Sequence, residues 1–329
     1  MRYCGGDRNG RYTKLAQGDE ILLTEVDDGF HPGDDPWQTE GSWWSFSVPD
    51  RRIGGWIYHL TRLGQGVASG GVWVWDDSST SCFEAPYFLN HYHQQLPAAP
   101  HDLNDFRWPD GTHLKTITPL NRYRLTFEDR DVIALDLDFE GLTAPYVSAA
   151  GEPRRPFRLE QPCHVTGTLR LHGENIAVDC IGMRDHSWGI RSEGTLAPTP
   201  LAEQDLANAA RRPVIYLFGT QSAQAGFFVM ATHGYLLRDG VRRDLIDVGQ
   251  AVTRDPASGQ ITTITVSGTD DTGRSFTANG EVLSMITRPS NSGLGMIYIM
   301  RWDLDGITAW GELQDIWPID LWSAYRRSA

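Results

Sequence analysis

Large apolar residues occupy every second position in many short stretches of the chain, which is the pattern of a strand that buries one face. In the clearest stretch, residues 132–139, four such residues alternate with small or acidic ones: Ile133, Leu135, Leu137 and Phe139. More than a dozen such runs recur between residues 43 and 313, and Asp-Gly, Asn-Gly or His-Gly pairs separate several of them. This spacing is typical of antiparallel hairpins, so we predict an all-β protein built from barrels or sandwiches.

A single helix-like stretch divides the strand-like runs into two series. Residues 201–212 are rich in Ala, Gln, Glu and Leu and follow Pro198 and Pro200, which is typical of a helix. Residues 195–212 are therefore the expected connection between two β domains, 1–194 and 195–329. The Pro-rich residues 144–162 are expected to form a long loop within the first domain.

The composition agrees with an all-β fold and limits the classes of partner. The 329 residues are 40% hydrophobic and 22% charged, as in an ordinary globular protein, and include 12 Trp, 11 Tyr and 12 Phe beside 34 Gly. The formal net charge of −13 would repel a phosphate backbone or an anionic membrane surface, so we expect no nucleic-acid partner. The four cysteines lack C-x-x-C spacing and are expected to be free thiols.

Familiar targeting and catalytic signatures are absent from the sequence. Residues 1–12 are polar and Gly-rich, and no stretch approaches ~18 uninterrupted apolar residues, so we expect no membrane insertion and a cytoplasmic protein. The chain lacks a Walker loop, a G-x-G-x-x-G opening a helix, H-E-x-x-H and G-x-S-x-G. Nucleotide-dependent chemistry, zinc proteolysis and serine hydrolysis are disfavoured, and we expect no cofactor.

The densest group of chemically active side chains is Met183–Arg191, which holds an acid, an imidazole, a hydroxyl and an indole. If this segment is a strand, alternation places Arg184, His186 and Trp188 on one face and Asp185 on the other. A regular strand then cannot aim Asp185 and His186 at one substrate atom without a bulge or turn. The alternative is structural: an ion-pair knot in which an arginine of the segment holds Asp185 while Trp188 closes a barrel mouth.

Two imidazoles stand two positions apart at His91 and His93, a spacing that can chelate a metal from one strand face. A third ligand is missing, because Leu96 and Pro97 occupy the positions where a cupin-type site has Glu. We therefore expect both histidines to line a substrate pocket or to serve structure. Activity is expected to need no divalent metal.

Three successive predicted strands carry many aromatic residues: Trp43, Trp44, Trp56, Tyr58, Trp73 and Trp75. Core packing is the simplest interpretation. The functional interpretation is an apolar pocket with aromatic walls. Such a pocket suits a large, weakly polar ligand and stabilises a transient cation through its ring faces.

The segment Arg184-Asp185-His186-Ser187-Trp188-Gly189, preceded by Val165-Thr166-Gly167 and Asp179, resembles the R-D-H-S-W-G signature of the carotenoid 1,2-hydratase (hydroxyneurosporene synthase) and AttH-like superfamily. Residues 41–44, 70–76 and 309–312 are similar to flanking segments of bacterial relatives. The resemblance implies two lipocalin-like antiparallel β-barrels in tandem that bind small apolar ligands. It also implies catalytic roles for His186 and Trp188. A Tyr and an acid follow the motif in hydratase relatives; here Tyr216 lies at that distance, and Phe218 replaces the acid.

These observations predict a metal-independent enzyme that hydrates, dehydrates or cyclises a carbon-carbon double bond of a hydrophobic terpenoid, steroid or polyketide-like substrate. Asp185 or His186 would donate the proton and Trp188 would shelter the cation. The expected substrate-binding residues are aromatic or imidazole side chains: Trp43, Tyr58, Trp73, His91, His93, Tyr216 and Tyr235. Two alternatives stay open, a pericyclase that constrains a reactive polyene and a non-catalytic carrier of hydrophobic molecules.

Overall fold

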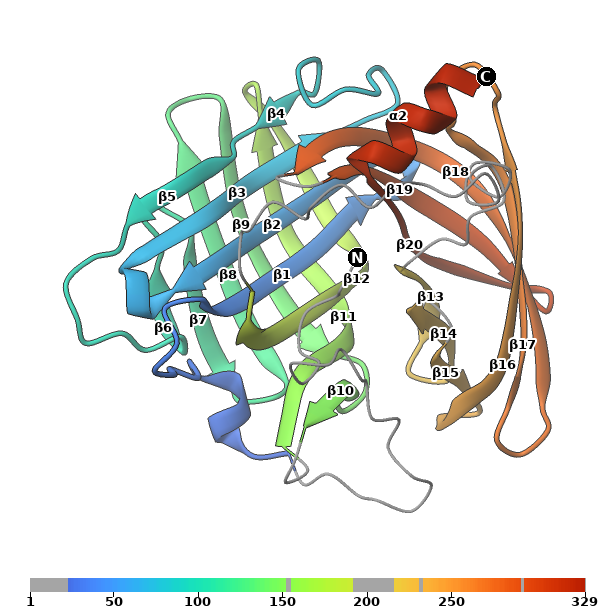
Figure 1. Ribbon diagram of the computed structural model, residues 1–329, viewed down its shortest axis with the longest axis horizontal. Helices are drawn as coiled ribbons and strands as arrows, with labels where there is room; N and C mark the ends of the chain where they lie inside the picture. Colours follow the sequence, from blue (N-terminus) through green and yellow to red (C-terminus); the bar gives the residue numbers. More distant parts are fainter. Residues whose placement is uncertain (1–22, 152–154, 192–215, 231–232, 291–292, 329) are drawn as a thin grey trace. The chain divides into compact units, whose positions relative to one another are not determined.

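The computed structural model describes residues 23–151, 155–191, 216–230, 233–290 and 293–328 (Figure 1). Of these residues, 67% lie in strands and 7% in helices, so the expected all-β fold is confirmed. Their helices are the 3-10 turns η1 (Glu25–Asp28), η2 (Pro49–Arg51) and η3 (Leu63–Gln65) and the α-helix α2 (Ile319–Ser328). None of the described helices is long and apolar enough to cross a membrane.

The described residues form two compact units, one with residues 23–48, 55–74 and 86–191 and the other with residues 49–54, 75–85 and 216–328. The expected helix and connection at 195–212, and the expected boundary after residue 194, lie outside the described residues. The cysteines within them are free, as expected: Cys82, Cys163 and Cys180.

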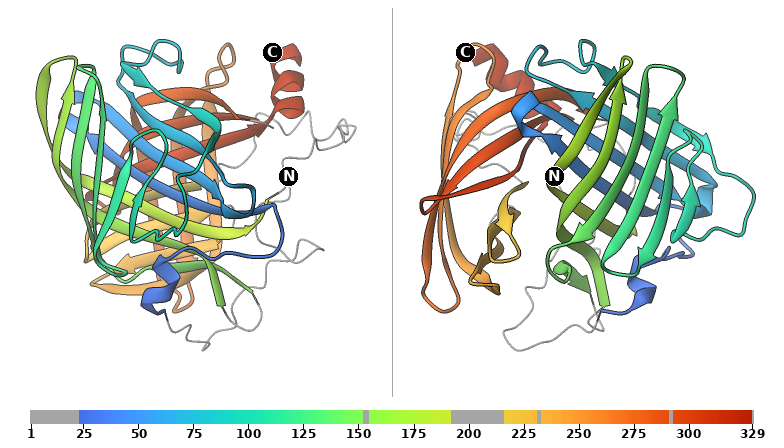
Figure 2. Two further views of the ribbon diagram at one scale, coloured as in Figure 1. Left: turned by 90° about the vertical axis from the view of Figure 1, so that its left-hand side faces the viewer. Right: turned by 180° about the vertical axis from the view of Figure 1, so that it is seen from behind.

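The first unit is a 12-stranded sheet. Its strands are β1 (Gln38–Val48), β2 (Ile53–Arg62), β3 (Val67–Trp75), β4 (Tyr87–Phe88), β5 (His91–Gln95), β6 (Asp105–Arg107), β7 (His113–Thr118), β8 (Arg122–Asp129), β9 (Ile133–Gly141), β10 (Tyr146–Gly151), β11 (Arg155–Leu171) and β12 (Glu174–Ile190). Neighbouring strands follow the order β4-β3-β2-β1-β12-β11-β9-β8-β7-β6, with β10 beside β11 and β5 beside β3. The motif strand β12 therefore lies well inside the sheet, between β1 and β11, as Figure 2 also shows.

Within residues 144–162, expected to be a loop, residues 146–151 form β10 and residues 155–162 begin β11, so that prediction was wrong. A change of pairing partner along β11 explains how Pro162 fits into this strand. β11 pairs with β10 up to Glu160 and with β9 from Cys163 onward, so Pro162 occupies the gap between the two partners, where no backbone N–H is needed. Its carbonyl still accepts a hydrogen bond from the Leu142 N–H at 2.9 Å.

The second unit contains a closed antiparallel barrel of eight strands, as the alternating pattern and the resemblance predicted. Its strands are β13 (Tyr216–Ser222), β14 (Ala225–Met230), β15 (His233–Arg238), β16 (Val241–Arg254), β17 (Ile261–Asp270), β18 (Ser275–Ser290), β19 (Gly293–Leu304) and β20 (Ile307–Pro318). Each strand pairs with the next, and β20 returns to β13 with Leu313 opposite Leu217.

Large apolar side chains fill this barrel and its end. Phe227 and Trp302 belong to the interior cluster and contact edge to face, with ring centroids 5.2 Å apart. At one end α2 packs Trp322 and Tyr325 against Trp317, at 5.2 and 5.3 Å. The rings seal the barrel end on the side where the chain leaves β20.

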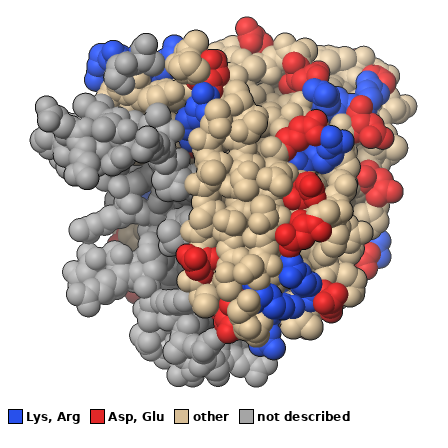
Figure 3. Space-filling view, turned by 90° about the vertical axis from the view of Figure 1, so that its right-hand side faces the viewer, with Lys and Arg blue, Asp and Glu red and all other residues tan. Residues whose placement is uncertain are grey.

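Charged side chains on the outer face over β16 and β17 are mixed in sign. Figure 3 shows Asp and Glu interspersed with Lys and Arg on this face, beside a broad area that carries neither. Among the described residues seen there, no large group of Lys and Arg forms a basic surface of the kind that a phosphate backbone needs.

The turn between β17 and β18 supplies a test of the barrel's stability. Asp270 accepts hydrogen bonds from the Thr272 hydroxyl and N–H and from the Arg274 N–H and guanidinium at 2.7–3.0 Å. Although burial opposes ionisation, these donors lower the pKa of Asp270 to about 2.

Because this pKa is lower in the folded than in the unfolded chain, the carboxylate stabilises the fold at neutral pH, and this contribution is lost as the pH falls from about 4 toward 2. We expect Asp270→Asn to lower the free energy of unfolding by about 1–3 kcal/mol at pH 7, measured by urea unfolding. The difference from the unmodified chain should shrink toward pH 2. Asp239→Asn in the exposed turn after β15, where the positive φ of 54° suits Asn, is the control and should change little.

Candidate active site

Strand β12 presents the Met183–Arg191 motif to both faces of the first unit's sheet. Its pairing with β1 and β11 is regular throughout the motif. Arg184, His186 and Trp188 therefore share one face and Asp185 lies on the other, as alternation predicts. Asp185 and His186 are neighbours in sequence but cannot act on the same atom.

The Arg184 face is the concave side of the sheet. Trp44 stands opposite Arg184 on β1, and its ring lies 5.0 Å from Tyr123 on β8 and 5.1 Å from Phe139 on β9, centroid to centroid. These strands are four and three positions from β1 in the sheet, and adjacent strands lie about 4.8 Å apart. Only inward curvature brings the rings into contact, so we call this side the concave face and the Asp185 side the convex face.

Two carboxylates and an arginine meet on the convex face. Asp185 stands opposite Trp43 of β1 and Glu160 of β11, so these three residues form a row across adjacent strands. Arg158 bridges the carboxylates: Nε donates to Glu160 Oε1 at 2.7 Å, and Nη2 lies 2.7 Å from Asp185 Oδ2. Both carboxylates are buried. The ion-pair knot considered for the motif is thus present around Asp185, but its arginine comes from β11.

A second arginine reaches the same cluster through a serine. Ser187 Oγ donates to Asp185 Oδ1 at 3.2 Å and accepts from Arg191 Nη2 at 2.7 Å. The glycine opposite Ser187 makes room for this contact, because a Cβ at Gly41 would lie 2.9 Å from Ser187 Oγ and 3.1 Å from Arg191 Nη1. The hydrogen bond fixes the orientation of the Asp185 carboxylate.

Aromatic rings continue from Trp43 across β2, β3 and β4. Trp43 contacts Trp56 at 5.1 Å, Trp56 stacks on Trp73 at 5.2 Å, and Tyr58 lies 6.1 Å from Trp73, measured between ring centroids. Phe88 stacks on the far side of this group, 5.5 Å from Trp73. The structure therefore brings together Trp43, Tyr58 and Trp73, three of the expected ligand-binding residues, in one group of rings that begins at Trp43, opposite Asp185.

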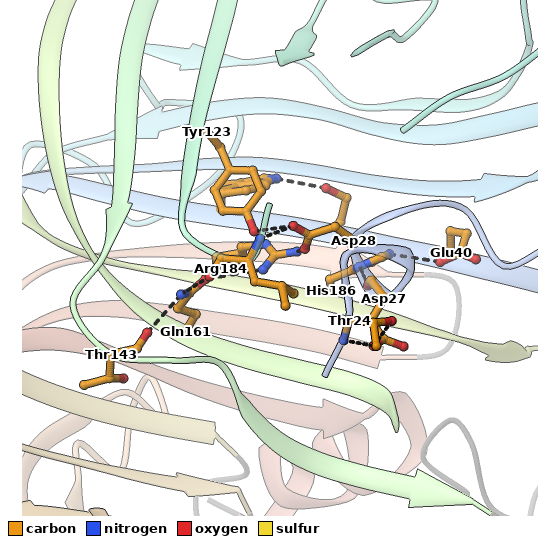
Figure 4. Close-up of polar contacts among 12 residues, drawn as sticks. Thr24, Asp27, Asp28, Glu40, Tyr123, Thr143, Gln161, Arg184 and His186 are labelled. Carbon is orange, nitrogen blue, oxygen red and sulfur yellow. Dashed lines mark hydrogen bonds and ion pairs between the residues drawn. The ribbon is translucent and has the colours of Figure 1, made fainter. Parts of the chain in front are cut away.

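The concave face carries a buried ion pair that joins β12 to the turn η1 (Figure 4). The Arg184 guanidinium is buried, pairs with Asp28, and donates to Gln161 Oε1 at 3.3 Å. Tyr123 donates its hydroxyl to Asp28 Oδ2 at 2.7 Å. Although burial opposes ionisation, Arg184, the Leu120 N–H and Tyr123 hold the pKa of Asp28 below its ordinary value.

A second concave group surrounds His186. Its Nε2 lies 3.1 Å from Glu40 Oε2, and its Nδ1 lies 3.1 Å from the carbonyl oxygen of Asp27 (Figure 4). Although burial opposes ionisation, the His186 and His31 imidazoles lower the pKa of Glu40. His31 also stacks flat on Trp188, with centroids 3.7 Å apart and an interplanar angle of 2°. One face of the Trp188 ring is therefore covered by His31.

His91 and His93 lie on β5, which pairs with β3. The register shifts between Ala68 and Gly70 of β3, and His93 adopts a positive φ of 51°, so regular alternation does not hold here. The substrate-lining or structural role expected for the two histidines stays a prediction. His93 Nε2 lies 3.5 Å from Arg62 Nη1.

Tyr216 and Tyr235 belong to the second unit. Both rings contact Phe228, at 5.1 and 5.7 Å, on the face of the barrel wall opposite to its interior cluster. Glu312 of β20 stands directly opposite Phe218 on the same face and is buried. An acid thus lies beside the position where Phe218 replaces one, a placement that spacing along a single strand did not reveal.

The fold and these sites define a class of protein: a two-part, lipocalin-like β protein with buried carboxylates beside aromatic rings. The chain belongs to the family described as a domain of unknown function (DUF7064), whose model matches residues 24–319. No curated protein matches the sequence.

Solved structures with a similar fold include an AttH protein from Nitrosomonas europaea, with a TM-score of 0.58 and 14% identity over 92% of this chain and 98% of that one. CghA matches with a TM-score of 0.50 and 12% identity over 86% of this chain and 88% of that one. Kievitone hydratase from Nectria haematococca matches with a TM-score of 0.47 and 10% identity over 93% and 96%. The expected AttH-like fold is confirmed; the narrower resemblance to carotenoid 1,2-hydratases stays a prediction.

Proposed function

We propose that this chain is an enzyme that transfers a proton to or from a carbon-carbon double bond of a hydrophobic, natural-product-like small molecule. The observation that carries the proposal is the row of Trp43, Asp185 and Glu160: two buried carboxylates beside an indole ring. Terpenoids, steroids and polyketide-like molecules have apolar skeletons that suit such a surface. Hydration, dehydration and cyclisation all use the same proton transfer.

The convex cluster has the groups that such a transfer needs. Asp185 and Glu160 both contact the Arg158 guanidinium and stand opposite each other on adjacent strands, so the two carboxylates can share one proton that the cluster takes up and returns. When the carboxylic acid protonates an alkene, its O–H bond breaks, a C–H bond forms at one carbon, and the other carbon becomes cationic. The carboxylate then accepts a proton from the water that adds, or from a neighbouring C–H, and the cluster returns to its starting state.

The rings next to the acid suit a cationic intermediate. A ring face attracts a cation by ~0.5–2 kcal/mol or more, most strongly where water is excluded, and Trp43 and Trp73 are buried. His186 and Trp188 lie on the opposite face of β12, so in this proposal they support the strand from behind. The direct catalytic roles that the family resemblance implies for them are the alternative.

Incubation with a panel of isoprenoid and polyketide alkenes in D2O, followed by mass spectrometry, tests the proposal. Proton transfer from a solvent-exchanging carboxyl group predicts one deuterium bound to carbon in each hydrated or cyclised product. An isomerised product without deuterium would instead indicate a pericyclase, and a ligand that binds unchanged would indicate a carrier. The cytoplasmic location and the absence of a nucleic-acid partner stay predictions.

A further inference from the structure

Three metal-ligand side chains from separate segments converge on the concave face. His31 follows η1, Glu40 lies on β1 and His186 on β12, and one ligand atom from each lies within 4.8 Å of the other two. His186 Nε2 is 3.1 Å from Glu40 Oε2, and His31 Nδ1 is 3.3 Å from Glu40 Oε1. This group lies on the other face of the sheet from Asp185 and takes no part in the proposed proton transfer.

The hydrogen bond to Asp27 fixes the state of the His186 ring. A backbone carbonyl only accepts hydrogen bonds, so Nδ1, 3.1 Å from the Asp27 oxygen, carries the hydrogen. In a neutral imidazole Nε2 then presents a lone pair, and here that lone pair faces the Glu40 carboxylate. Two lone pairs at 3.1 Å repel each other unless a cation lies between them.

His31 carries the same implication independently. Both of its ring nitrogens are buried, and neither meets the geometry of a hydrogen bond within the described residues, although Nδ1 lies 3.3 Å from Glu40 Oε1. A buried polar atom in this state usually marks a water or ion at the site. The stacked Trp188 ring covers the imidazole and limits its motion, which holds Nδ1 toward Glu40.

We propose that His31, Glu40 and His186 bind a divalent cation of the zinc type. Zn²⁺ takes tetrahedral nitrogen and oxygen ligands at about 2.0–2.1 Å, which places the ligand atoms about 3.3 Å from one another. The distances from His186 Nε2 and His31 Nδ1 to the Glu40 carboxylate oxygens, 3.1 and 3.3 Å, are close to this value. A cavity of ≈ 10 Å³, about the volume that one water needs, adjoins two of the three ligands, His31 and Glu40. The His186 contact with Asp27 is the outer hydrogen bond that ligating histidines commonly make.

The cation would fasten the segment around η1 to the centre of the sheet. His31 is the one ligand outside the sheet, and Asp28, three residues earlier, already pairs with Arg184 beside His186. Metal and ion pair would thus hold two points of the same segment against β12. Because the unfolded chain has no preformed site, binding should raise the melting temperature.

Metal binding to the full chain tests this inference without any assay of activity. The chelator-treated protein should take up one equivalent of Zn²⁺ in competition with a chromophoric chelator, and its Tm should rise. Co²⁺ should give the intense visible bands of a tetrahedral site. His31→Gln and His186→Gln should each weaken Zn²⁺ binding at least 100-fold, whereas His164→Gln, in an exposed imidazole-carboxylate pair on β11, should leave it unchanged.

Two results would overturn the inference. The first is that the folded, unmodified chain takes up less than a tenth of an equivalent of Zn²⁺ and Co²⁺, while ¹⁵N spectra show His186 protonated at both nitrogens. A proton would then be the cation between His186 and Glu40. The second is binding that survives in His31→Gln and disappears in His91→Gln, which would place the metal on β5. Both readouts use the unmodified chain or single variants, so failure of one variant to fold leaves the test intact.

Discussion

Asparagine in place of Asp185 is expected to lower kcat by about 10²–10⁴-fold, the range typical of losing a general acid or base. Asn keeps the size of the side chain and an oxygen for Arg158, so the strand pairing should survive. It cannot hold or return the transferred proton. The rate is measured with whichever alkene incorporates deuterium and is divided by the folded fraction from circular dichroism.

A matched variant on the same strand controls for the loss of charge. The Asp179 side chain is 80% exposed and pairs with His164, so Asp179→Asn should change kcat less than twofold. Glu160→Gln should slow turnover as Asp185→Asn does if the two carboxylates share the proton. An Asp185→Asn protein that turns over at the normal rate would remove Asp185 from the reaction.

Methionine in place of Arg184 is expected to lower the free energy of unfolding by about 3–5 kcal/mol, because the buried Asp28 carboxylate then lacks its counter-charge. Asp28→Asn removes the other charge and should also destabilise the fold. The double variant Asp28→Asn with Arg184→Met should cost clearly less than the sum of the single variants, since neither charge is then left alone. Urea unfolding of the four proteins gives the coupling free energy.

The exposed pair of Arg124 and Asp136 is the control for that cycle. Its geometry is equally close, with contacts of 2.6 and 2.8 Å, but both side chains are about half exposed. Solvent screening should limit the effect of Arg124→Met to about 0–1 kcal/mol. Equal losses from Arg124→Met and Arg184→Met would mean that the concave ion pair does not anchor η1.

The sequence predicted what depends on local order. Period-two alternation identified the strands and the two faces of β12, because a strand's side chains alternate whatever its partners are. It also separated Asp185 from His186 before any pairing was known. Where the backbone leaves regular geometry, as at His93 with its positive φ, the same argument does not apply. Proline content misled at residues 144–162 because a gap between two partner strands tolerates Pro162.

The partners of the motif could not be predicted, because strand order brings them from distant segments. Glu40 is 146 positions from His186, and Glu160 is 25 from Asp185. Nothing along the chain states which residues will stand opposite each other. The sequence carried little signal for either acid: Glu40 stands between Thr39 and Gly41, and Glu160 lies in the Pro-rich stretch expected to be a loop. Glu312 beside Phe218 escaped notice for the same reason.

In the proposed function, the two faces of β12 divide the motif into a chemical side and an anchoring side. Asp185 joins a second carboxylate, a bridging arginine and a row of rings on the convex face. Arg184, His186 and Trp188 hold the segment around η1 on the concave face. Under this proposal, the strand serves reaction and stability in alternate positions.

Turnover per folded molecule in Asp185→Asn, compared directly with that in His186→Gln, tests this division. The two residues are adjacent in sequence and lie on opposite faces of β12, so the comparison tests which face carries the chemistry. We predict that Asp185→Asn loses at least 100-fold in kcat with a small change in stability. His186→Gln should lose stability and stay within a few-fold of normal kcat. A folded His186→Gln protein without turnover, beside a fully active Asp185→Asn protein, would place the chemistry on the concave face.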